Sequence, residues 1–263
     1  MQVNKVYNVD CLEGMEQFLK HCGENSIDLT VTSPPYNIGK VYEKKKSIEK
    51  YLEFSADYLN LVYKLLKNKS SLMLQVGCYI DKNSNNIPLS YHLYPYLKKI
   101  GFNLRQEIVW SFRGGMQAKK KLTGQNEKIL WLYKGQELPY FNLDSIRIKE
   151  WKTMDKRNNP NGKNPTDVWE INRVAGNSKE KMSHPCQFPT SMIDRIIKGW
   201  CVEGGLVLDP FMGSGTTAVS AINTGRNYLG FELDRTYFEE SNQRIAEHVT
   251  YLRHRGGGIN DGN

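Results

Sequence analysis

The segment from 205 to 232 places the tightest limits on the fold. Gly205–Asp209 (GLVLD) and Asn227–Phe231 (NYLGF) are short apolar runs, which predicts two buried strands. A glycine-rich turn follows the first run, and Thr216–Thr224 between the two runs has the pattern of a helix. Strands that alternate with helices in this way predict an α/β fold built on a parallel sheet.

The rest of the chain continues this alternation. The predicted strands are Ser26–Thr32, Ser71–Val76, Glu107–Phe112 and Lys128–Tyr133. The predicted helices are Tyr51–Leu66, Leu89–Ile100, Thr190–Cys201 and Tyr237–His248. A chain of 263 residues is long enough for one sizeable core with an inserted subdomain. The polar tail from Gly256 to Asn263 is rich in glycine, which predicts a flexible end.

The positive charge is concentrated in the middle of the chain. The formal net charge is +8, and Ser111–Lys163 holds 12 Lys and Arg against 5 Asp and Glu. Asn, Gly and Pro interrupt Asn158–Pro165, so we predict an irregular insert with a basic face. Such a face favours an anionic partner, with nucleic acid the usual one, although charge that serves only solubility is the alternative.

Cysteine usage and hydropathy exclude several classes of protein. Five cysteines with no CxxC pair predict neither a zinc site nor a disulfide framework, so we expect no bound metal. No apolar run approaches the roughly 18 residues that span a bilayer, and the first ten residues lack the apolar region of a signal peptide. A cytoplasmic protein without membrane contact is therefore expected.

The turn after the first C-terminal strand has the composition of a ligand-binding loop. Asp209–Thr217 (DPFMGSGTT) joins a strand to a helix, where glycines allow close backbone approach and the helix offers free amides. A phosphate-binding P-loop would need a Lys that is absent here, whereas a purely structural turn stays possible. Glu232 ends the next strand, 23 positions after Asp209, where an acidic residue accepts bonds from ribose hydroxyls. The pattern suits an adenosine cofactor without phosphates, and the acidic rim would tolerate cationic S-adenosylmethionine.

A second candidate site follows the first predicted strand. Thr32–Asn37 (TSPPYN) contains two prolines that fix the backbone. The oxygen of Ser33 and the carbonyl of Pro34 are suited to accept both protons of an amino group, and Tyr36 is suited to stack on a flat ring. A Pro-Pro turn with a surface tyrosine is the structural alternative.

Together these motifs resemble the amino-methylating DNA methyltransferases, which act on N4 of cytosine or N6 of adenine. The resemblance covers most of the chain and includes Ser33–Tyr36, HPCQFP at 184–189, VLDPFMGSGTT at 207–217, GRNYLGFELD at 225–234 and QRI at 243–245. The catalytic motif precedes the basic insert and the cofactor motif, which is similar to the β group of this family. The resemblance implies a Rossmann-like, S-adenosylmethionine-dependent methyltransferase fold that is circularly permuted and carries an inserted target-recognition region.

The resemblance also implies which residues bind and react. The Ser33 strand should lie beside the Asp209 strand, so that both loops open at the same edge of the sheet. The expected catalytic residues are Ser33, Pro34, Pro35 and Tyr36. The expected cofactor-binding residues are Asp10, Asp209, Pro210, Phe211, Gly213, Ser214, Gly215, Thr216, Thr217 and Glu232. Asp10 is implied to contact the adenine of the cofactor, or it caps the helix that follows.

DNA contacts are expected from basic residues in and near the insert. Arg113, Lys119, Lys120 and Lys121 are the predicted DNA-binding residues within it, together with Lys40 in the lysine-rich loop after the catalytic motif. Lys149, Lys152, Lys156 and Arg157 have the same expectation. The predicted division is 1–110 for the catalytic half, 111–183 for target recognition, 184–250 for the cofactor half and 251–263 for the tail.

Several alternatives for function remain at this point. Ser33 resembles the cytosine-N4 pattern, so transfer to N4 of cytosine is preferred over N6 of adenine. A protein glutamine methyltransferase uses a similar N-P-P-Y turn but lacks a basic insert, and a DNA-binding module without catalysis would not need both motifs. The expected partners are double-stranded DNA and a cognate restriction endonuclease, and the chain is expected to be a monomer or homodimer. The target sequence cannot be predicted.

Overall fold

The computed structural model describes residues 1–37, 39, 45–81, 83, 85–114, 117–149, 158–176, 178 and 180–256. Its strands are β1 (Lys5–Tyr7), β2 (Ile27–Thr32), β3 (Leu66–Val76), β4 (Cys78–Ile80), β5 (Asn86–Pro88), β6 (Asn103–Ser111), β7 (Asn126–Tyr133), β8 (Val168–Glu170), β9 (Leu206–Asp209) and β10 (Asn227–Phe231). Its helices are α1 (Cys11–Cys22), α2 (Ile48–Leu65), α3 (Leu89–Ile100), α4 (Thr190–Trp200), α5 (Thr216–Asn223) and α6 (Arg235–Gly256), with a short 3-10 helix η1 (Asp144–Ile146). None of the described helices is both long and apolar enough to cross a bilayer.

The central sheet has eight strands in the order β1-β10-β9-β2-β3-β7-β6-β8. Strands β1, β10, β9, β2 and β3 run parallel, as the alternation of strands and helices predicts. The predicted parallel sheet is interrupted at β7, which lies antiparallel to both β3 and β6. The physical reason is that β6 and β7 form a hairpin without a crossover helix, and only antiparallel strands can be joined in that way.

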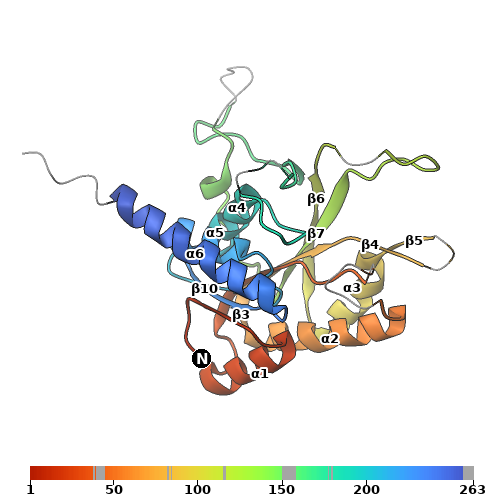
Figure 1. Ribbon diagram of the computed structural model, residues 1–263, viewed down its shortest axis with the longest axis horizontal. Coiled ribbons are helices and arrows are strands. Elements are labelled where there is room, and N and C mark those ends of the chain that lie inside the picture. The colour runs from red at the N-terminus through yellow and green to blue at the C-terminus, as the bar shows by residue number, and fades with distance from the viewer. Residues whose placement is uncertain are drawn as a thin grey trace, which may run out of the picture.

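Helices cover both faces of this sheet (Figure 1). Helices α1, α2 and α3 bury side chains such as Phe18, Tyr58 and Leu93 in one apolar core. Helices α4, α5 and α6 pack into a second core on the opposite face. Neighbouring residues of β9 divide between the two cores, Val207 on one side and Leu208 on the other, because successive side chains of a strand point to opposite faces.

The structure adds elements that the sequence analysis does not identify. The short strand β1 pairs with β10 at the edge of the sheet, and α1 follows it directly. Within the range 111–183, β7 and β8 belong to the central sheet, since β7 pairs with β3 and β8 pairs with β6. The described parts of the connection between β6 and β7, residues 112–114 and 117–125, extend beyond the sheet (Figure 1).

Candidate active site

The two motifs meet at the carboxyl edge of the sheet, as expected. Strand β2 pairs parallel with β9, so Thr32 and Asp209 end neighbouring strands. Thr32 Oγ1 donates a hydrogen bond of 2.8 Å to Asp209 Oδ1. Ser33 therefore follows directly on a residue that is bonded to the glycine-rich loop, and the predicted methyl-accepting and cofactor loops form one structural unit.

Asp209 is buried, and both of its carboxylate oxygens accept hydrogen bonds from other residues of the protein. Besides the bond from Thr32, the Phe211 amide donates to Oδ1 over 3.1 Å, and Thr217 Oγ1 donates to Oδ2 over 2.6 Å. Burial raises the pKa of Asp209 to about 7, although these three bonds oppose the shift. Asp209 thus joins β2, β9 and the start of α5, and it shapes the loop through bonds to the chain itself.

The glycine-rich loop has a backbone that favours glycine. Gly213 and Gly215 have φ of 52° and 76°, in the left-handed region where a side chain is strained. Gly215 caps α5, and the hydroxyls of Ser214 and Thr216 lie 3.2 Å apart in the buried interior of the loop. The buried members of the predicted cofactor-binding set are Asp209, Pro210, Gly213, Ser214, Gly215, Thr216 and Thr217. Phe211 is half-buried and packs edge-on against Tyr58 of α2.

Glu232 and Asp10 bring two further carboxylates to the same edge. Glu232 follows β10 and accepts hydrogen bonds of 2.8 Å from the amides of Gly213 and Asp234, one on each carboxylate oxygen. Its amide donates to the carbonyl of Tyr7, which ends β1. Asp10 follows that strand and caps α1, since its Oδ1 accepts a bond of 2.9 Å from the Leu12 amide. The helix-cap interpretation of Asp10 is therefore confirmed, and an additional contact with adenine stays a prediction.

The catalytic motif forms a tight loop with Tyr36 inside it. Pro34 is buried, whereas Ser33, Pro35 and Tyr36 are half-buried. Ser33 Oγ lies 3.1 Å from Tyr36 Oη, and Tyr36 Oη lies 3.1 Å from Glu127 Oε2 on β7. The Tyr36 ring lies against Gly77, where an added Cβ would approach the ring to 2.7 Å. The sequence analysis did not identify Glu127, which enters the site only because β7 lies beside β3.

Asn37 closes the segment that follows the catalytic motif. Its side chain donates to the carbonyl of Lys46 over 2.8 Å and accepts from the Lys46 amide over 2.6 Å. Asn37 has a φ of 60°, a left-handed conformation that asparagine tolerates better than most residues. The predicted DNA contact Lys40 lies between these anchors but outside the described residues.

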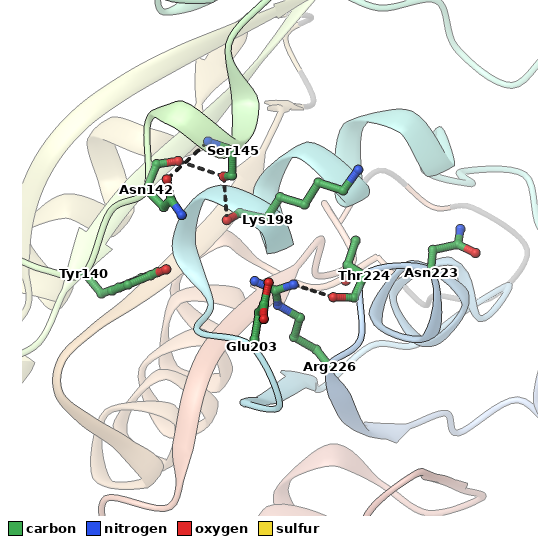
Figure 2. A pocket seen from close by; sticks show the side chains of 8 residues that line it. All are labelled: Tyr140, Asn142, Ser145, Lys198, Glu203, Asn223, Thr224 and Arg226. Atoms are coloured by element: carbon green, nitrogen blue, oxygen red, sulfur yellow. Dashed lines mark hydrogen bonds between the residues drawn. The ribbon is translucent and has the colours of Figure 1, made fainter. Parts of the chain in front are cut away.

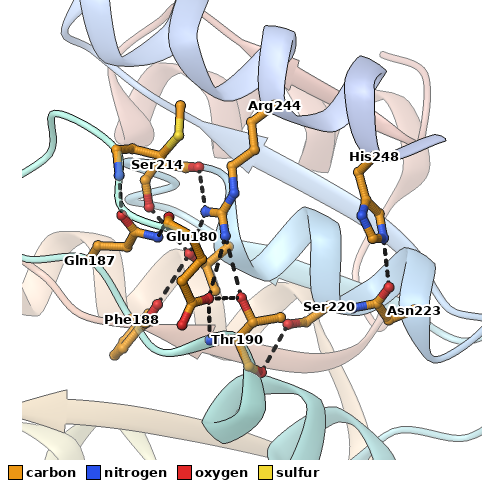
Figure 3. Close-up of polar contacts among 11 residues, drawn as sticks. Glu180, Gln187, Phe188, Thr190, Ser214, Ser220, Asn223, Arg244 and His248 are labelled. Carbon is orange, nitrogen blue, oxygen red and sulfur yellow. Dashed lines mark hydrogen bonds and ion pairs between the residues drawn. The ribbon is translucent and has the colours of Figure 1, made fainter. Parts of the chain in front are cut away.

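Arg244 of α6 contacts the glycine-rich loop and the start of α4 (Figure 3). Its guanidinium donates to the carbonyl of Ser214 over 3.0 Å and to Thr216 Oγ1 over 2.9 Å. It also reaches Thr190 at the start of α4 and lies 3.8 Å from the carboxylate of Glu180. Arg244 belongs to the QRI segment of the family pattern, and the sequence alone does not indicate these contacts.

His184 packs against the same loop. Its ring meets the ring of Tyr237 at a centroid distance of 4.6 Å, and a Cβ on Gly213 would come within 3.4 Å of it. Burial and the charge of Lys181 lower the pKa of His184 to about 4, so the ring is neutral at pH 7. This geometry supports packing over proton transfer as its role.

Two cavities lie away from this edge. One has a volume of about 390 Å³ and is lined by residues that include Lys198, Glu203 and Arg226, which precede β9 or β10 (Figure 2). It therefore opens at the amino edge of these strands, opposite the predicted site. The Arg226 guanidinium donates hydrogen bonds there to the carbonyls of Cys201 and Thr224. The second, of about 360 Å³, lies beside α6 and includes Arg244 and His248.

The predicted DNA-binding residues of the insert lie on one exposed connection. Arg113, Lys119, Lys120 and Lys121 are exposed and lie between β6 and β7. Lys149 is also exposed, while Lys152, Lys156 and Arg157 lie outside the described residues. Within the described parts of the chain, no group of three or more His, Cys, Asp or Glu side chains gathers as a metal site would require.

Comparison with known proteins identifies relatives along nearly the whole chain. A family model described as DNA methylase matches residues 27–243. The Type II methyltransferase M.BglII of Bacillus subtilis is 37% identical over 93% of this chain and 69% of its own length. M.ScaI of Streptomyces caespitosus is also 37% identical, over 94% and 83%. The DNA adenine methyltransferase YhdJ of Escherichia coli K12 is 32% identical, over 88% and 81%.

Solved structures show the same fold. The PvuII DNA methyltransferase, described as cytosine-N4-specific, matches with a TM-score of 0.75 at 20% identity over 94% of this chain and 91% of its own. A putative DNA modification methylase from Thermus thermophilus, complexed with S-adenosyl-L-methionine, matches with a TM-score of 0.66 at 24% identity over 93% and 95%. At these identities the likeness concerns the fold.

Proposed function

The chain belongs to the DNA methylase family that its residues 27–243 match, and on that premise we propose that it transfers a methyl group from S-adenosylmethionine to N4 of cytosine in double-stranded DNA. The observation that carries this proposal is the bond between Thr32 and Asp209. It brings a loop of amino-group acceptors next to a glycine-rich loop with an acidic rim. Methyl transfer between two bound molecules requires that kind of juxtaposition.

The residues present fit S-adenosylmethionine. Each Glu232 carboxylate oxygen accepts one backbone amide and has capacity for another donor, so it can accept a ribose hydroxyl. Asp10 ends the neighbouring turn and retains acceptor capacity toward the adenine amino group. Asp209, whose oxygens are occupied within the chain, acts indirectly by holding the loop. When bound, S-adenosylmethionine would supply an activated methyl group on a sulfonium. Transfer would break the carbon–sulfur bond as the nitrogen–carbon bond forms, would leave a neutral thioether, and would release one amino proton to solvent.

The protein binds and orients the amino group. A base inside a duplex must be extruded to reach the sheet edge. The Ser33 oxygen and the Pro34 carbonyl then accept the two amino protons, which concentrates lone-pair density on the nitrogen. Pro34 and Pro35 keep these acceptors fixed, and the face of Tyr36 that does not contact Gly77 stacks on the base.

The DNA lies against the connection between β6 and β7. We propose that Arg113, Lys119, Lys120 and Lys121 contact phosphates, since all four are exposed on one connection beside the hairpin that carries Glu127. Lys40 has the same proposed role. Target recognition is assigned to 111–183, apart from β7 and β8, which complete the sheet. The name Type II, which relatives carry, supports a proposal that a restriction endonuclease shares the target.

The choice of base rests on Ser33, and transfer to N6 of adenine is the second candidate. YhdJ, a relative at 32% identity, is described as a DNA adenine methyltransferase. The PvuII enzyme, a structural neighbour, is described as specific for N4 of cytosine. Serine at the first position of the motif supports the cytosine assignment.

One assay tests both the reaction and the base. Purified protein is incubated with plasmid and isotopically labelled S-adenosylmethionine, and the DNA is digested to nucleosides for mass spectrometry. N4-methylcytosine is expected, N6-methyladenine would replace the assigned base, and unlabelled DNA would overturn the function. Sequencing of the methylated plasmid gives the target sequence, and Tyr36→Ala provides the inactive control.

A further inference from the structure

A half-buried carboxylate lies behind the catalytic loop. Glu127 of β7 is half-buried, and its Oε2 accepts hydrogen bonds from Tyr36 Oη and from the amide nitrogen of Gln75 on β3. Tyr36 Oη accepts in turn from Ser33 Oγ, so a line of hydrogen bonds leads from Ser33 through Tyr36 to Glu127. Gly77 lets the Tyr36 ring lie close enough for this line to form.

The chemistry of these groups fixes the direction of each bond. The Gln75 amide nitrogen can only donate, so Glu127 Oε2 must be an acceptor. With Glu127 ionised, both of its oxygens can only accept, so Tyr36 gives its single proton to Glu127 and the Tyr36 oxygen accepts from Ser33. Ser33 has used its own proton, so only its lone pairs remain for a bound base.

This direction matches the chemistry that the loop needs. An amino group is a double donor and requires acceptors, whereas a carbonyl oxygen would meet the Ser33 lone pairs without a proton between them. Without Glu127, the buried Tyr36 proton would turn to Ser33 Oγ, its remaining partner in this line, because an unmade buried hydrogen bond is unfavourable. The Ser33 proton would then point toward the base and oppose binding of the amino group.

We propose that Glu127 is a positioning residue that holds Ser33 as an acceptor through Tyr36, and so selects bases that present an amino group at this position. The proposal deepens the methyltransferase function above and rests on it. Burial raises the pKa of Glu127, while the bonds from Tyr36 and Gln75 and the charge of Arg173 oppose that shift. The two donors aimed at Oε2 keep that oxygen an acceptor.

The test compares Glu127→Leu, which removes the acceptor, with Glu127→Gln, which keeps an oxygen that can accept from Tyr36. Duplexes carry the target sequence found by plasmid sequencing. Single-turnover methylation should fall about 10-fold or more in Glu127→Leu, the usual effect of losing a charge-assisted hydrogen bond, and should recover to within about 3-fold in Glu127→Gln. Matched controls are Glu107→Leu and Glu107→Gln, since Glu107 is a half-buried glutamate on the neighbouring strand β6 that pairs with Lys128. Both should behave as wild type.

A binding measurement separates orientation from general damage. Uracil replaces the target cytosine in the duplex, which exchanges the amino group for a carbonyl, and affinities are measured by fluorescence anisotropy with S-adenosylhomocysteine present. Wild type should bind the cytosine duplex about 10-fold more tightly than the uracil duplex, which is near the lower end of the cost of an unpaired polar group in a binding site. Glu127→Leu should lose most of this preference. Cofactor affinity should change less than about 2-fold, because the line lies on the base side of the site.

Tyr36→Phe keeps the test decisive if Glu127→Leu does not fold. It removes one oxygen, leaves the ring against Gly77, and should reduce the preference for cytosine as Glu127→Leu does. Adding Glu127→Gln to Tyr36→Phe should have no further effect, because Glu127 acts through the lost hydroxyl.

Wild-type methylation with an unchanged cytosine preference in Tyr36→Phe or Glu127→Leu overturns the inference and leaves the function standing. Equal loss in Glu127→Leu and Glu127→Gln overturns it too. Absence of methylation by wild type overturns the function, and with it this inference.

Discussion

Thr32 Oγ1 donates a 2.8 Å hydrogen bond to Asp209 Oδ1, and this buried contact joins the ends of two parallel strands that lie 177 residues apart in the sequence. The Asp209 carboxylate also accepts from Thr217 at the start of α5. One threonine hydroxyl and one carboxylate therefore link the loop after β2 to the glycine-rich loop, in addition to the backbone pairing of β2 with β9.

Thr32→Val tests the strength of this link, because valine has nearly the same shape without the hydroxyl. We expect the free energy of unfolding to fall by about 1–3 kcal/mol, since Asp209 loses a buried donor. Thr30→Val on the same strand is the matched control: within the described part of the chain, Thr30 Oγ1 is buried without a hydrogen-bond partner. Its loss should be neutral or stabilising by up to about 1 kcal/mol. Urea unfolding measures both variants, and equal destabilisation would contradict a specific role for the Thr32 bond.

Asp209 should make stability depend on pH. Burial raises its folded-state pKa to about 7, above the ordinary value of 3.8, so the folded protein holds this proton more tightly than the unfolded chain does. That contribution is complete below about pH 4 and is lost as the pH rises toward 7, with a slope of up to about 1.4 kcal/mol per pH unit. In Asp209→Asn this contribution is absent. The difference in unfolding free energy between wild type and variant should therefore change between pH 4 and 7. A constant difference across that range would contradict the shift.

The two strands beside the glycine-rich motif and helix α3 were the easiest elements to predict. Strand β10 and helix α3 begin and end at the predicted residues, and β9 begins one residue later than predicted. Neighbouring residues in the sequence determine where such elements end. For example, α3 ends before Gly101, which has the left-handed conformation that is common after helices. β1 has only three residues, too few to show a periodic pattern.

The contacts that complete the site are non-local and escaped prediction. Glu127 reaches Tyr36 only because β7 inserts between β3 and β6, a pairing that the order of elements does not determine. One signal was available, because Gln75 and Glu127 are polar residues at the ends of apolar strands. By contrast, the meeting of Ser33 and Asp209 could be inferred, since both follow parallel strands and share one edge.

Glu232 should control cofactor affinity. Glu232→Gln replaces one carboxylate oxygen by an amide that cannot accept from the Gly213 or Asp234 backbone, and it removes the charge offered to the ribose. We expect binding of S-adenosylmethionine to weaken by about 1.5–3 kcal/mol, or roughly 10- to 100-fold. Calorimetry measures this, with Glu239→Gln on the exposed face of α6 as control. Affinity equal to that of the control would exclude Glu232 from the cofactor site.

Arg244 should support the loop without touching the ligand. Arg244→Lys keeps the charge but cannot bond Ser214, Thr216 and Thr190 together, because lysine lacks the planar guanidinium. We expect a loss of about 1–3 kcal/mol in unfolding free energy together with weaker cofactor binding. Arg235→Lys is the comparison on the same helix, since its exposed pair with Glu239 should contribute less than about 0.5 kcal/mol. Thermal unfolding that is identical in the two variants would argue against this role.

The three adjacent lysines between β6 and β7 should govern the salt dependence of DNA binding. Lys119, Lys120 and Lys121 are exposed, and each phosphate that a cation neutralises releases counterions from the duplex. Replacing all three by Gln should reduce the slope of log affinity against log salt by about 2–3, since each contact contributes roughly 0.9. Non-target duplex is the appropriate probe, because phosphate contacts act on any sequence.

The control replaces Lys5, Lys20 and Lys64 by Gln: all three are exposed and lie near the amino ends of the strands, away from the catalytic loop. It lowers the net charge equally, so it measures the general effect of charge on binding. Anisotropy titrations from 50 to about 200 mM salt give both slopes. If the two triple variants show the same slope, the DNA does not lie along the connection between β6 and β7, and the proposed orientation of the duplex is wrong.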